Sequence, residues 1–450
     1  MAAQGSSHVP YFTPAHDPPP GEAMSPPSQL PTLFQPIKIR SCTLKNRIIV
    51  APMCQYSAPS SLNATVAQPE GSLTQYHLAT LGHYALKGAS LVFVEATGVA
   101  PNGRISPNCP GLWSDDQIPA LRNICQFIHV QGGKVGMQLA HAGRKGSTAP
   151  PNVAAAQKPP MLSLRADVEH GGWPDNVPGP TGGMAWSQKD DGRQYWPPRE
   201  LSRGDIRSLV ENFAQAARRC VEAGIDVIEI HSAHGYLLHQ FLSPITNRRT
   251  DGYGGSFENR TRFLVEVINA IRRVIPADMP LFLRVSATEW MEKSEIAKER
   301  GSWDEESTMR LAKLLPALGV DLLDVSSGGN CEEQSIQPHS GYQVEIAGRI
   351  RKMMKDADLK LLIGAVGLIT EAEQARDIVE GSIQEEARVA KDMLDAKGGK
   401  EPLADVVLIA RQFMRDPAFV LRAAAELDVK VAWPAQFRRV RFNTKRANKI

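Results

Sequence analysis

Short apolar runs recur along the chain, each separated from the next by a longer amphipathic stretch. The runs are continuous rather than alternating in polarity, which is typical of parallel strands buried on both faces. The eight runs lie at 47–53, 90–97, 134–141, 226–234, 281–287, 322–327, 360–367 and 405–413. The stretches between most of them place apolar residues at helical spacing and end at glycine or a short polar segment. The pattern therefore predicts strands that alternate with helices.

Regular alternation of helices and parallel strands predicts an α/β fold, the (β/α)8 TIM barrel, ahead of an open doubly wound sheet. A short hairpin, "IKIRSCTLKNR", precedes the first strand and is expected to plug the bottom of the barrel. Two insertions interrupt the rhythm. Residues 142–200, after the third strand, are rich in Gly, Pro and Trp. Residues 380–404, before the eighth strand, are charged and are expected to form a solvated helix.

Composition divides the chain into three segments. Residues 1–31 are rich in Pro, Gly, Ser and Ala, which predicts a disordered or polyproline-type arm. Residues 32–437 contain all the strand and helix signals and are assigned to the barrel. Residues 438–450 form a basic C-terminal tail that is expected to be solvated for most of its length.

Charge and cysteine content narrow the function classes. The chain has 51 basic and 48 acidic residues, a balance that argues against a broad nucleic-acid surface. No apolar run reaches the roughly 18 residues of a membrane span, and the N-terminus does not read as a signal peptide. None of the six cysteines lies in a C-x-x-C pair, which gives little support to zinc ribbons or iron–sulfur clusters. We therefore expect a cytoplasmic protein that binds neither nucleic acid nor membranes.

Polar and titratable side chains gather where the predicted strands end. The third run contains Gln138, and the fifth contains Arg284. The fourth run, "IEIHSAHGY", passes directly from a buried strand into His231, His234 and Tyr236. Barrel enzymes place their active sites at the carboxyl ends of the strands. These residues are therefore candidates for one site.

The last two strand ends have the character of a phosphate site. The seventh ends in "GAVG", which includes Gly367, and the eighth is followed by Arg411. Backbone N–H groups and a guanidinium at this place commonly hold a phosphate. No G-x-G-x-x-G follows the first strand, which argues against a resident nicotinamide bound in Rossmann fashion. The pattern indicates a phosphate-bearing cofactor with a flat reactive ring.

Several segments together resemble the Old Yellow Enzyme family of FMN-dependent ene-reductases. They are "APMCQYS", "LAHAGRK", "IEIHSAHGYLLHQFLSPITNRRTDGYGGSFENR", "LFLRVSA", "GAVG" and "RQFMRDP". The resemblance covers Leu33 to Phe437, and the long fourth-strand segment is its most specific part. Met53–Cys54 and the histidine pair are similar to the thermophilic-like branch of the family. The insertions and the Pro-rich arm are similar to eukaryotic members, which suggests a fungal source.

The resemblance implies tightly but non-covalently bound FMN, with NADPH or NADH as co-substrate. The positions that match the flavin site are Ala51, Pro52, Met53, Cys54, Ala96, Gln138, Arg284, Gly367, Ala410 and Arg411. Arg284 would stabilise the negative charge of a reduced flavin. Alternatives are core packing for Cys54, a polar interior filler for Gln138 and a buried salt bridge for Arg284. The family usually has glycine where this chain has Ala410, so binding should survive unless that residue needs a positive φ.

The substrate-side residues follow from the same resemblance. His231 and His234 match a pair that hydrogen-bonds the substrate oxygen, and Tyr236 matches the phenol that protonates the α-carbon. Tyr56 matches a phenol on the opposite wall. Structural histidines or a partial metal site are the alternatives. A helical zinc pair would be spaced i, i+4 with a third ligand, and neither condition is evident, so no metal is expected.

Arg439 stands where thermophilic-like relatives place an arginine that reaches the neighbouring subunit's active site, which implies a homodimer. The resemblance implies an ene-reductase: NAD(P)H reduces FMN, which then passes hydride to the β-carbon of an α,β-unsaturated carbonyl or nitro compound. Alternatives are a pathway-specific reductase or isomerase of secondary metabolism, or a flavin-binding protein without turnover. A dienoyl-CoA reductase-like enzyme is disfavoured because the chain lacks cluster cysteines and a further C-terminal domain.

Overall fold

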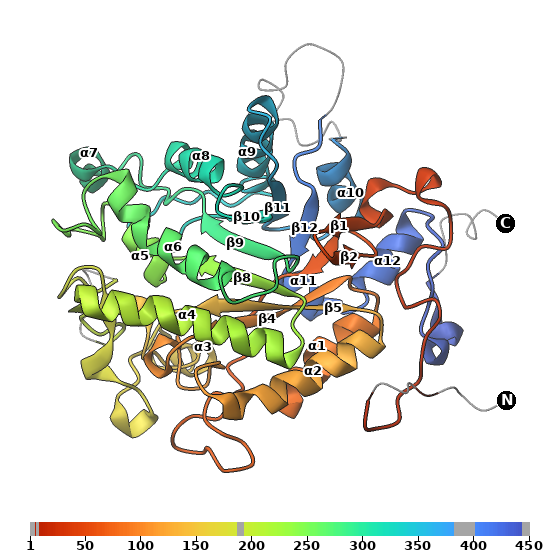
Figure 1. The fold of residues 1–450 in the computed structure, drawn as a ribbon, viewed down its shortest axis with the longest axis horizontal. Helices are drawn as coiled ribbons and strands as arrows, with labels where there is room; N and C mark the ends of the chain where they lie inside the picture. The colour runs from red at the N-terminus through yellow and green to blue at the C-terminus, as the bar shows by residue number, and fades with distance from the viewer. Residues whose placement is uncertain (1–4, 6–8, 187–192, 382–400, 443–450) are drawn as a thin grey trace.

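The computed structural model describes residues 5, 9–186, 193–381 and 401–442 (Figure 1). Its centre is a closed barrel of eight strands in which every neighbouring pair is parallel. The barrel strands are β3 (Ile48–Val50), β4 (Leu91–Gly98), β5 (Lys134–Ala140), β8 (Val227–Ser232), β9 (Leu281–Ser286), β10 (Leu322–Ser326), β11 (Leu362–Val366) and β12 (Val406–Ile409). The predicted (β/α)8 architecture is confirmed.

Helices surround the strands and cover their outer surface (Figure 1). The longer helices are α1 (Gln75–Leu86), α2 (Ile118–Val130), α4 (Arg203–Ala223), α6 (Phe257–Arg272), α8 (Glu305–Leu314), α9 (Val344–Asp356), α10 (Ala372–Glu380) and α12 (Phe419–Glu426). Local sequence sets their ends. Ser202 and Asp205 form a capping box at the start of α4, and Gly224 ends it in the left-handed region at φ 95°. Removing such a cap costs about 1 kcal/mol.

The barrel interior is packed with side chains, so it holds no ligand channel. Phe93 on β4 and Phe282 on β9 meet with ring centroids 6.0 Å apart, and both are buried. The hairpin of β1 (Ile37–Ile39) and β2 (Cys42–Leu44) packs into the same hydrophobic cluster as these two rings and fills the bottom of the barrel, as expected. Filling the bottom and the middle leaves the carboxyl ends of the strands as the place for a site.

The N-terminal arm is described from residue 9 onward. Residues 9–31 lie against the barrel and run beside the C-terminal segment (Figure 1). The Gly21 N–H donates to the Ala432 carbonyl and the Met24 N–H donates to the Lys430 carbonyl, both at 2.9 Å. A proline-rich chain can pair in this way through its non-proline residues. Residues 1–4 and 6–8 lie outside the described part.

The described part of the first insertion, residues 142–186 and 193–200, contacts the loops that follow β8 and β10, at the carboxyl ends of the strands. It contains α3 (Pro151–Ala155) and the short pair β6 (Pro178–Gly179) and β7 (Arg199–Glu200). Arg249 ties the end of the insertion to the barrel, because its guanidinium contacts Glu200 at 3.4 Å while Asp251 of its own loop holds it at 2.8 Å. The Arg249 Nη1 also donates to the Leu201 carbonyl at 2.6 Å. Most of the second insertion, residues 382–400, lies outside the described residues.

Candidate active site

Strand register brings the polar side chains to one rim of the barrel. His231 on β8 pairs with Arg284 on β9, and Arg284 pairs with Asp324 on β10. Gln138 on β5 pairs with Glu229 on β8, two residues below His231. Because these strands are adjacent and parallel, their predicted site residues come together without any help from loops.

The two histidines and Tyr236 form a compact aromatic group. The rings of His231 and His234 lie 5.1 Å apart at 87°, and those of His231 and Tyr236 lie 4.9 Å apart at 82°. The Ala233 N–H donates to His231 Nδ1 at 3.3 Å, which leaves the proton of a neutral imidazole on Nε2. His234 Nε2 lies 2.7 Å from Ser326 Oγ, so the tautomer of that ring depends on the hydroxyl.

The turn after β8 needs an unusual backbone. His234 has φ 57° and Gly235 has φ 72°, which places both in the left-handed region. The loop after β10 presses against this turn: a Cβ on Gly329 would lie 2.7 Å from the His234 Cα. Lys145 joins the two segments, because its ammonium donates to the carbonyls of His234 at 3.0 Å and Gly329 at 2.9 Å. The position of His234 is therefore set by packing between two loops.

Burial keeps these groups in their neutral forms. It lowers the pKa of both histidines, and the Arg284 charge lowers the pKa of His231 further. Burial also raises the pKa of Tyr236, with smaller contributions from the thiols of Cys54 and Cys109 and the phenol of Tyr195. The site thus presents neutral imidazole N–H and phenol O–H donors at neutral pH.

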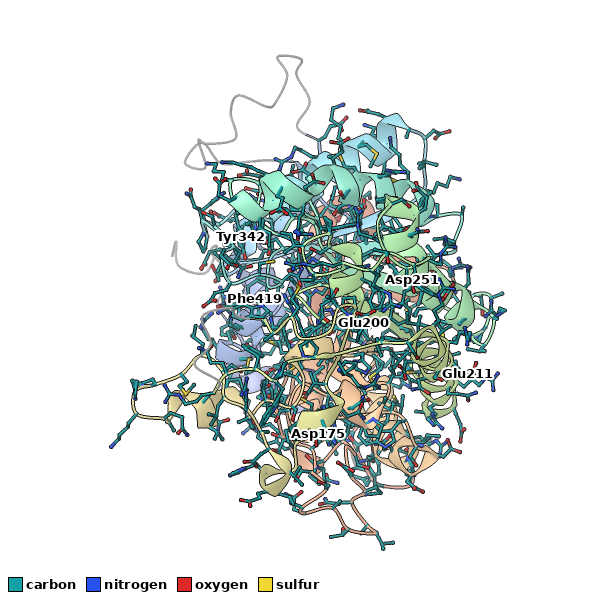
Figure 2. All side chains as sticks on the ribbon, turned by 90° about the vertical axis from the view of Figure 1, so that its left-hand side faces the viewer. Asp175, Glu200, Glu211, Asp251, Tyr342 and Phe419 are labelled. Carbon is teal, nitrogen blue, oxygen red and sulfur yellow. The ribbon has the colours of Figure 1, made fainter. Side chains whose placement is uncertain are left out.

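A cavity of about 380 Å³ adjoins His234 and extends to the ends of β11 and β12; we call it the inner cavity. Its lining includes Pro52, His234, Arg284, Ser326, Ser327, Tyr342, Gln343, Gly367, Ala410, Arg411 and Arg415. It therefore joins Arg284 to the expected phosphate residues. Figure 2 shows Tyr342 above Phe419, the first residue of α12.

The phosphate end of the inner cavity fits an anion. Gly367 has φ 111°, which favours glycine there, and a Cβ would lie 2.4 Å from Gln343 Nε2. Ala410 has φ −102°, so the positive φ that would have required glycine there does not occur. Arg411 begins the short helix α11 (Arg411–Arg415), which places two guanidiniums at this end. The donors and cations present are those that a phosphate needs.

The remaining predicted flavin residues are placed less uniformly. Ala96 and Gln138 are buried on β4 and β5. Cys54 is half-buried; its hydrogen bond to Cys109 and its burial raise the pKa of the thiol. Met53 packs against the main core. The Ala51 side chain packs in the core at the bottom of the barrel. Its N–H donates to the Ile409 carbonyl, so its backbone extends the pairing of β3 with β12.

The two other predicted substrate residues, Tyr56 and Arg439, differ in their surroundings. Tyr56 is half-buried with φ 53°, and burial raises its pKa. Arg439 is exposed in a 3₁₀ turn, Ala435–Val440, and is not among the residues that line the inner cavity. Its expected reach into a neighbouring subunit stays a prediction.

The sequence reasoning missed several residues that line the inner cavity or lie beneath it. Ser326 and Ser327 at the end of β10, with Tyr342 and Gln343 before α9, complete its wall. Polar residues at the end of the sixth apolar run, "LLDVSS", were the available signal.

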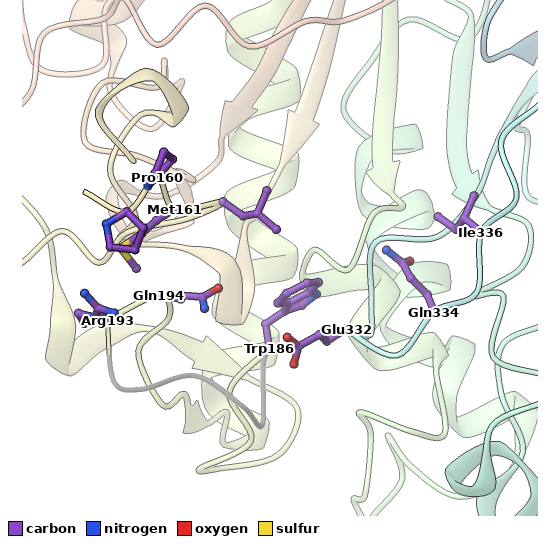
Figure 3. Close-up of a pocket in the computed structure, with 10 residues that line it drawn as sticks. Pro160, Met161, Trp186, Arg193, Gln194, Glu332, Gln334 and Ile336 are labelled. Atoms are coloured by element: carbon purple, nitrogen blue, oxygen red, sulfur yellow. The ribbon is translucent and has the colours of Figure 1, made fainter. Parts of the chain in front are cut away.

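A second cavity, of about 540 Å³, lies under the first insertion; we call it the outer cavity. It is lined by Pro159, Pro160, Met161, Leu162, Trp186, Arg193, Gln194, Glu332, Gln334 and Ile336. Figure 3 shows Trp186 between the side formed by Gln194 and the side formed by Glu332. The Trp186 Nε1 donates to the Gly329 carbonyl at 3.0 Å. Lys145 Nζ lies 5.2 Å from the Trp186 ring and 5.4 Å from the Tyr236 ring, which links the outer cavity to the site.

The barrel, the rim of neutral donors and the anion-binding cavity define a class of barrel enzymes that bind a phosphate-bearing redox cofactor. Comparison with known proteins makes the class specific. The model of the NADH:flavin oxidoreductase / NADH oxidase family, an FMN family, matches residues 32–430. The chain belongs to this family, which includes the Old Yellow Enzyme proteins. It is therefore an oxidoreductase with FMN as cofactor and NAD(P)H as co-substrate.

Individual relatives agree over nearly the full length. An NADH:flavin oxidoreductase of Gibberella zeae is 41% identical over 435 residues, 96% of this chain and 93% of that protein. An NADPH dehydrogenase of Bacillus velezensis is 36% identical over 408 residues, 90% of this chain and 98% of that protein. The structure of morphinone reductase has a TM-score of 0.60 at 25% identity, covering 90% and 91% of the two chains. Among the described residues, no helix combines the length and apolarity needed to cross a membrane.

Proposed function

We propose that the protein is an ene-reductase, which uses NADPH or NADH to reduce the C=C bond of α,β-unsaturated aldehydes, ketones, imides or nitroalkenes. One observation carries the proposal: two neutral imidazoles and a protonated phenol converge on one wall beside the inner cavity. Donors of this kind suit an uncharged acceptor oxygen that becomes negative during reaction.

The histidines polarise the substrate. Both donate to the same carbonyl or nitro oxygen, which makes the β-carbon electrophilic and stabilises the charge that develops on that oxygen. Ser326 supports this role for His234, because a hydroxyl that donates to Nε2 leaves the proton of the neutral ring on Nδ1. Pre-placed donors of this type are typically worth about 3–4 kcal/mol each.

Tyr236 supplies the proton. Its raised pKa keeps the phenol protonated, and its ring packs against that of His231 with centroids 4.9 Å apart, so we assign its O–H to the same substrate as the imidazoles. The α-carbon receives this proton, while Tyr56 faces the substrate from the other wall. A general acid in place contributes roughly 10²–10⁴-fold to the rate.

We also propose which residues bind the cofactor. Pro52, Arg284, Gly367, Ala410 and Arg411 line the inner cavity and would hold FMN there. Gln138 and Ala96 lie on neighbouring strands, and Cys54 follows β3. FMN supplies the hydride transfer between NAD(P)H and the substrate. The fixed charge of Arg284 favours the reduced, anionic form of the cofactor.

The test follows the flavin colour. Purified protein should show a flavin spectrum that bleaches anaerobically with NADPH, and an enone should restore it. A His231→Ala, His234→Ala double variant should be reduced by NADPH normally but reoxidised by the enone far more slowly. Protein that gains no colour from added FMN, or a double variant with unchanged reoxidation, would contradict the proposal.

Finer assignments remain part of the proposal. The higher identity to the Gibberella protein than to the Bacillus protein supports a fungal member of the thermophilic-like branch. We also propose a cytoplasmic homodimer. A pathway-specific reductase or isomerase would keep the same site and would be recognised by its narrow substrate range. A flavin-binding protein without turnover would fail the reoxidation test.

A further inference from the structure

Two acidic side chains lie inside the barrel directly beneath the candidate flavin site. Glu229 on β8 and Asp324 on β10 are both 0% exposed. They stand on either side of β9, which carries Arg284. Carboxyl groups are almost never fully buried unless they are paired, so this position requires an explanation.

Each carboxyl holds a side chain of the predicted flavin site. Gln138 Nε2 donates to Glu229 Oε1 at 2.7 Å. Arg284 Nε lies 2.7 Å from Asp324 Oδ2. Among the described residues, Glu229 Oε2 and Asp324 Oδ1 are buried beside these contacts without a hydrogen-bond partner of their own, and each carboxyl shifts the pKa of the other. The four residues thus form one group across β5, β8, β9 and β10.

A hydrogen bond between two carboxyls requires a proton on one of them. The charged groups that face Glu229 are Asp324 and Arg284, and Gln138 is its neutral partner. With both carboxyls ionised, the group would carry a net charge of −1 out of contact with water. Burial and then repulsion from Asp324 raise the pKa of Glu229, whereas Arg284 counteracts the effect of burial on Asp324. The proton therefore belongs on Glu229.

We propose that Glu229 and Asp324 share one proton and act as positioning residues for Gln138 and Arg284. A proton on Glu229 would let its O–H donate to Asp324. The contacts agree with this arrangement: Gln138 donates to Glu229, and Asp324 forms an ion pair with Arg284. One N–H of the Gln138 amide is thereby engaged, which fixes which way the amide presents its oxygen. This inference rests on the proposed FMN site.

The shared proton also sets the charge beneath the cofactor. The group is neutral while the proton is present and carries −1 when it is lost. Loss of the proton at high pH disfavours an anionic reduced flavin nearby, so the midpoint potential should fall more steeply with pH in that range. Conversely, flavin reduction should make the carboxyl pair hold its proton more tightly.

Two substitutions separate this role from a purely structural one. Glu229→Gln keeps an acceptor for Gln138 and a donor to Asp324, so it imitates the protonated acid without titrating. The flavin midpoint potential of this variant should equal that of the wild type at neutral pH. At higher pH it should not show the steeper fall expected for the wild type. Burial and repulsion from Asp324 raise the pKa of Glu229, and Asp324→Asn removes the repulsion. Glu229 should then be ionised beside Arg284 at neutral pH, so the group stays neutral and the extra slope above neutral pH should disappear.

The experiment is a dye-calibrated potential titration of the FMN-loaded protein across pH, with FMN affinity of the apoprotein measured by fluorescence quenching. Glu289→Gln is the matched control, because Glu289 is equally buried but held by Ser243 and the Trp303 N–H instead. That variant should keep the wild-type slope. An unchanged slope above neutral pH in Glu229→Gln or in Asp324→Asn would overturn the proposal.

A measurement on the unmodified protein guards against variants that fail to fold. The infrared difference spectrum between oxidised and reduced protein should contain a carboxylic-acid C=O band that shifts on reduction, and its absence would also overturn the proposal. None of these measurements uses an enone. If the midpoint potentials behave as predicted but an enone is not reduced, the proposed ene-reductase function is contradicted. The inference about the carboxyl pair is then still supported.

Discussion

At the scale of single residues, the site depends on backbone conformations that few residues adopt. His234 carries a left-handed φ of 57°, and it is kept there by contact with Gly329, whose own φ is 89°. Strained positions of this kind persist only where the surrounding structure holds them. The substrate-facing imidazole is therefore positioned by a glycine 95 residues further along the chain.

Gly329→Ala should displace His234, because the new methyl group would lie 2.7 Å from its Cα. A shift of about 1 Å at a catalytic group costs on the order of 10²-fold in rate. We expect kcat/KM for an enone to fall by about that factor while FMN binding is retained. Gly255→Ala is the control, since Gly255 has φ 82° but nothing within 4 Å of its Cβ position. Equal losses in both variants would contradict the mechanism.

The pH dependence of the enone step should follow Lys145 rather than the histidines. Burial and the nearby Arg144 charge lower the pKa of Lys145 to about 7, whereas the histidines are already neutral there. The lysine is charged below that pH and lies near Tyr236, where it favours negative charge on the substrate oxygen. The rate of anaerobic reoxidation should therefore decline as pH rises through about 7. Lys145→Met should be slower at low pH and should lose this transition; a variant that keeps it would contradict the assignment.

At the scale of elements, the insertion after β5 builds a roof that the barrel alone lacks. Arg144 is buried and donates to the Ala185 carbonyl at 3.1 Å and to the Asn330 carbonyl at 2.5 Å. It thereby holds the insertion to the loop after β10. The rings of Trp186 and Tyr195 lie nearby, with centroids 5.2 Å apart and tilted by 48°. The roof thus adds aromatic surface next to the catalytic group.

Trp186→Ala should weaken binding of enones that carry a large apolar substituent, because such a group would extend from the site into the outer cavity. We expect a rise in KM of roughly tenfold for these substrates and little change for a small cyclic enone. Trp186→Phe keeps an aromatic ring but loses the hydrogen bond to Gly329, so it should retain most of the affinity. Val168→Ala, at an exposed position in the same insertion, is the control. Equal effects on small and large substrates would exclude the roof as a specificity element.

At the scale of the whole molecule, the two ends of the chain pack together. The arm at 21–24 pairs with residues 430–432, and Gly21 and Gly88 approach so closely that a Cβ on Gly21 would lie 2.4 Å from the Gly88 carbonyl oxygen. Phe437 is held near by Lys87, whose ammonium lies 3.3 Å from the ring centroid. The 3₁₀ turn that carries Arg439 is thus attached to the barrel, with the Arg439 side chain exposed.

Arg439→Ala should raise KM for the enone if the arginine completes a neighbouring subunit's site, as the family resemblance implies. Sedimentation or light scattering should report a dimer for both proteins, and reduction by NADPH should be unaffected. Arg441→Ala, two residues along and also exposed, is the matched control. A monomeric wild type, or an unchanged KM, would contradict the prediction.

The chain by itself determined the barrel and the identity of the residues at its rim. Continuous apolar runs specify strands that are buried on both faces. Because the parallel strands of a barrel all end on one side, the sequence alone places His231, Arg284 and Arg411 at the same rim. Tertiary structure alone decided the rest. The left-handed His234, the carboxyl pair of Glu229 and Asp324 and the aromatic roof depend on contacts between segments far apart in sequence, and such contacts leave no local periodicity. The placement of the N-terminal arm is another feature that tertiary contacts decide, since its backbone hydrogen-bond partners lie about 400 residues away.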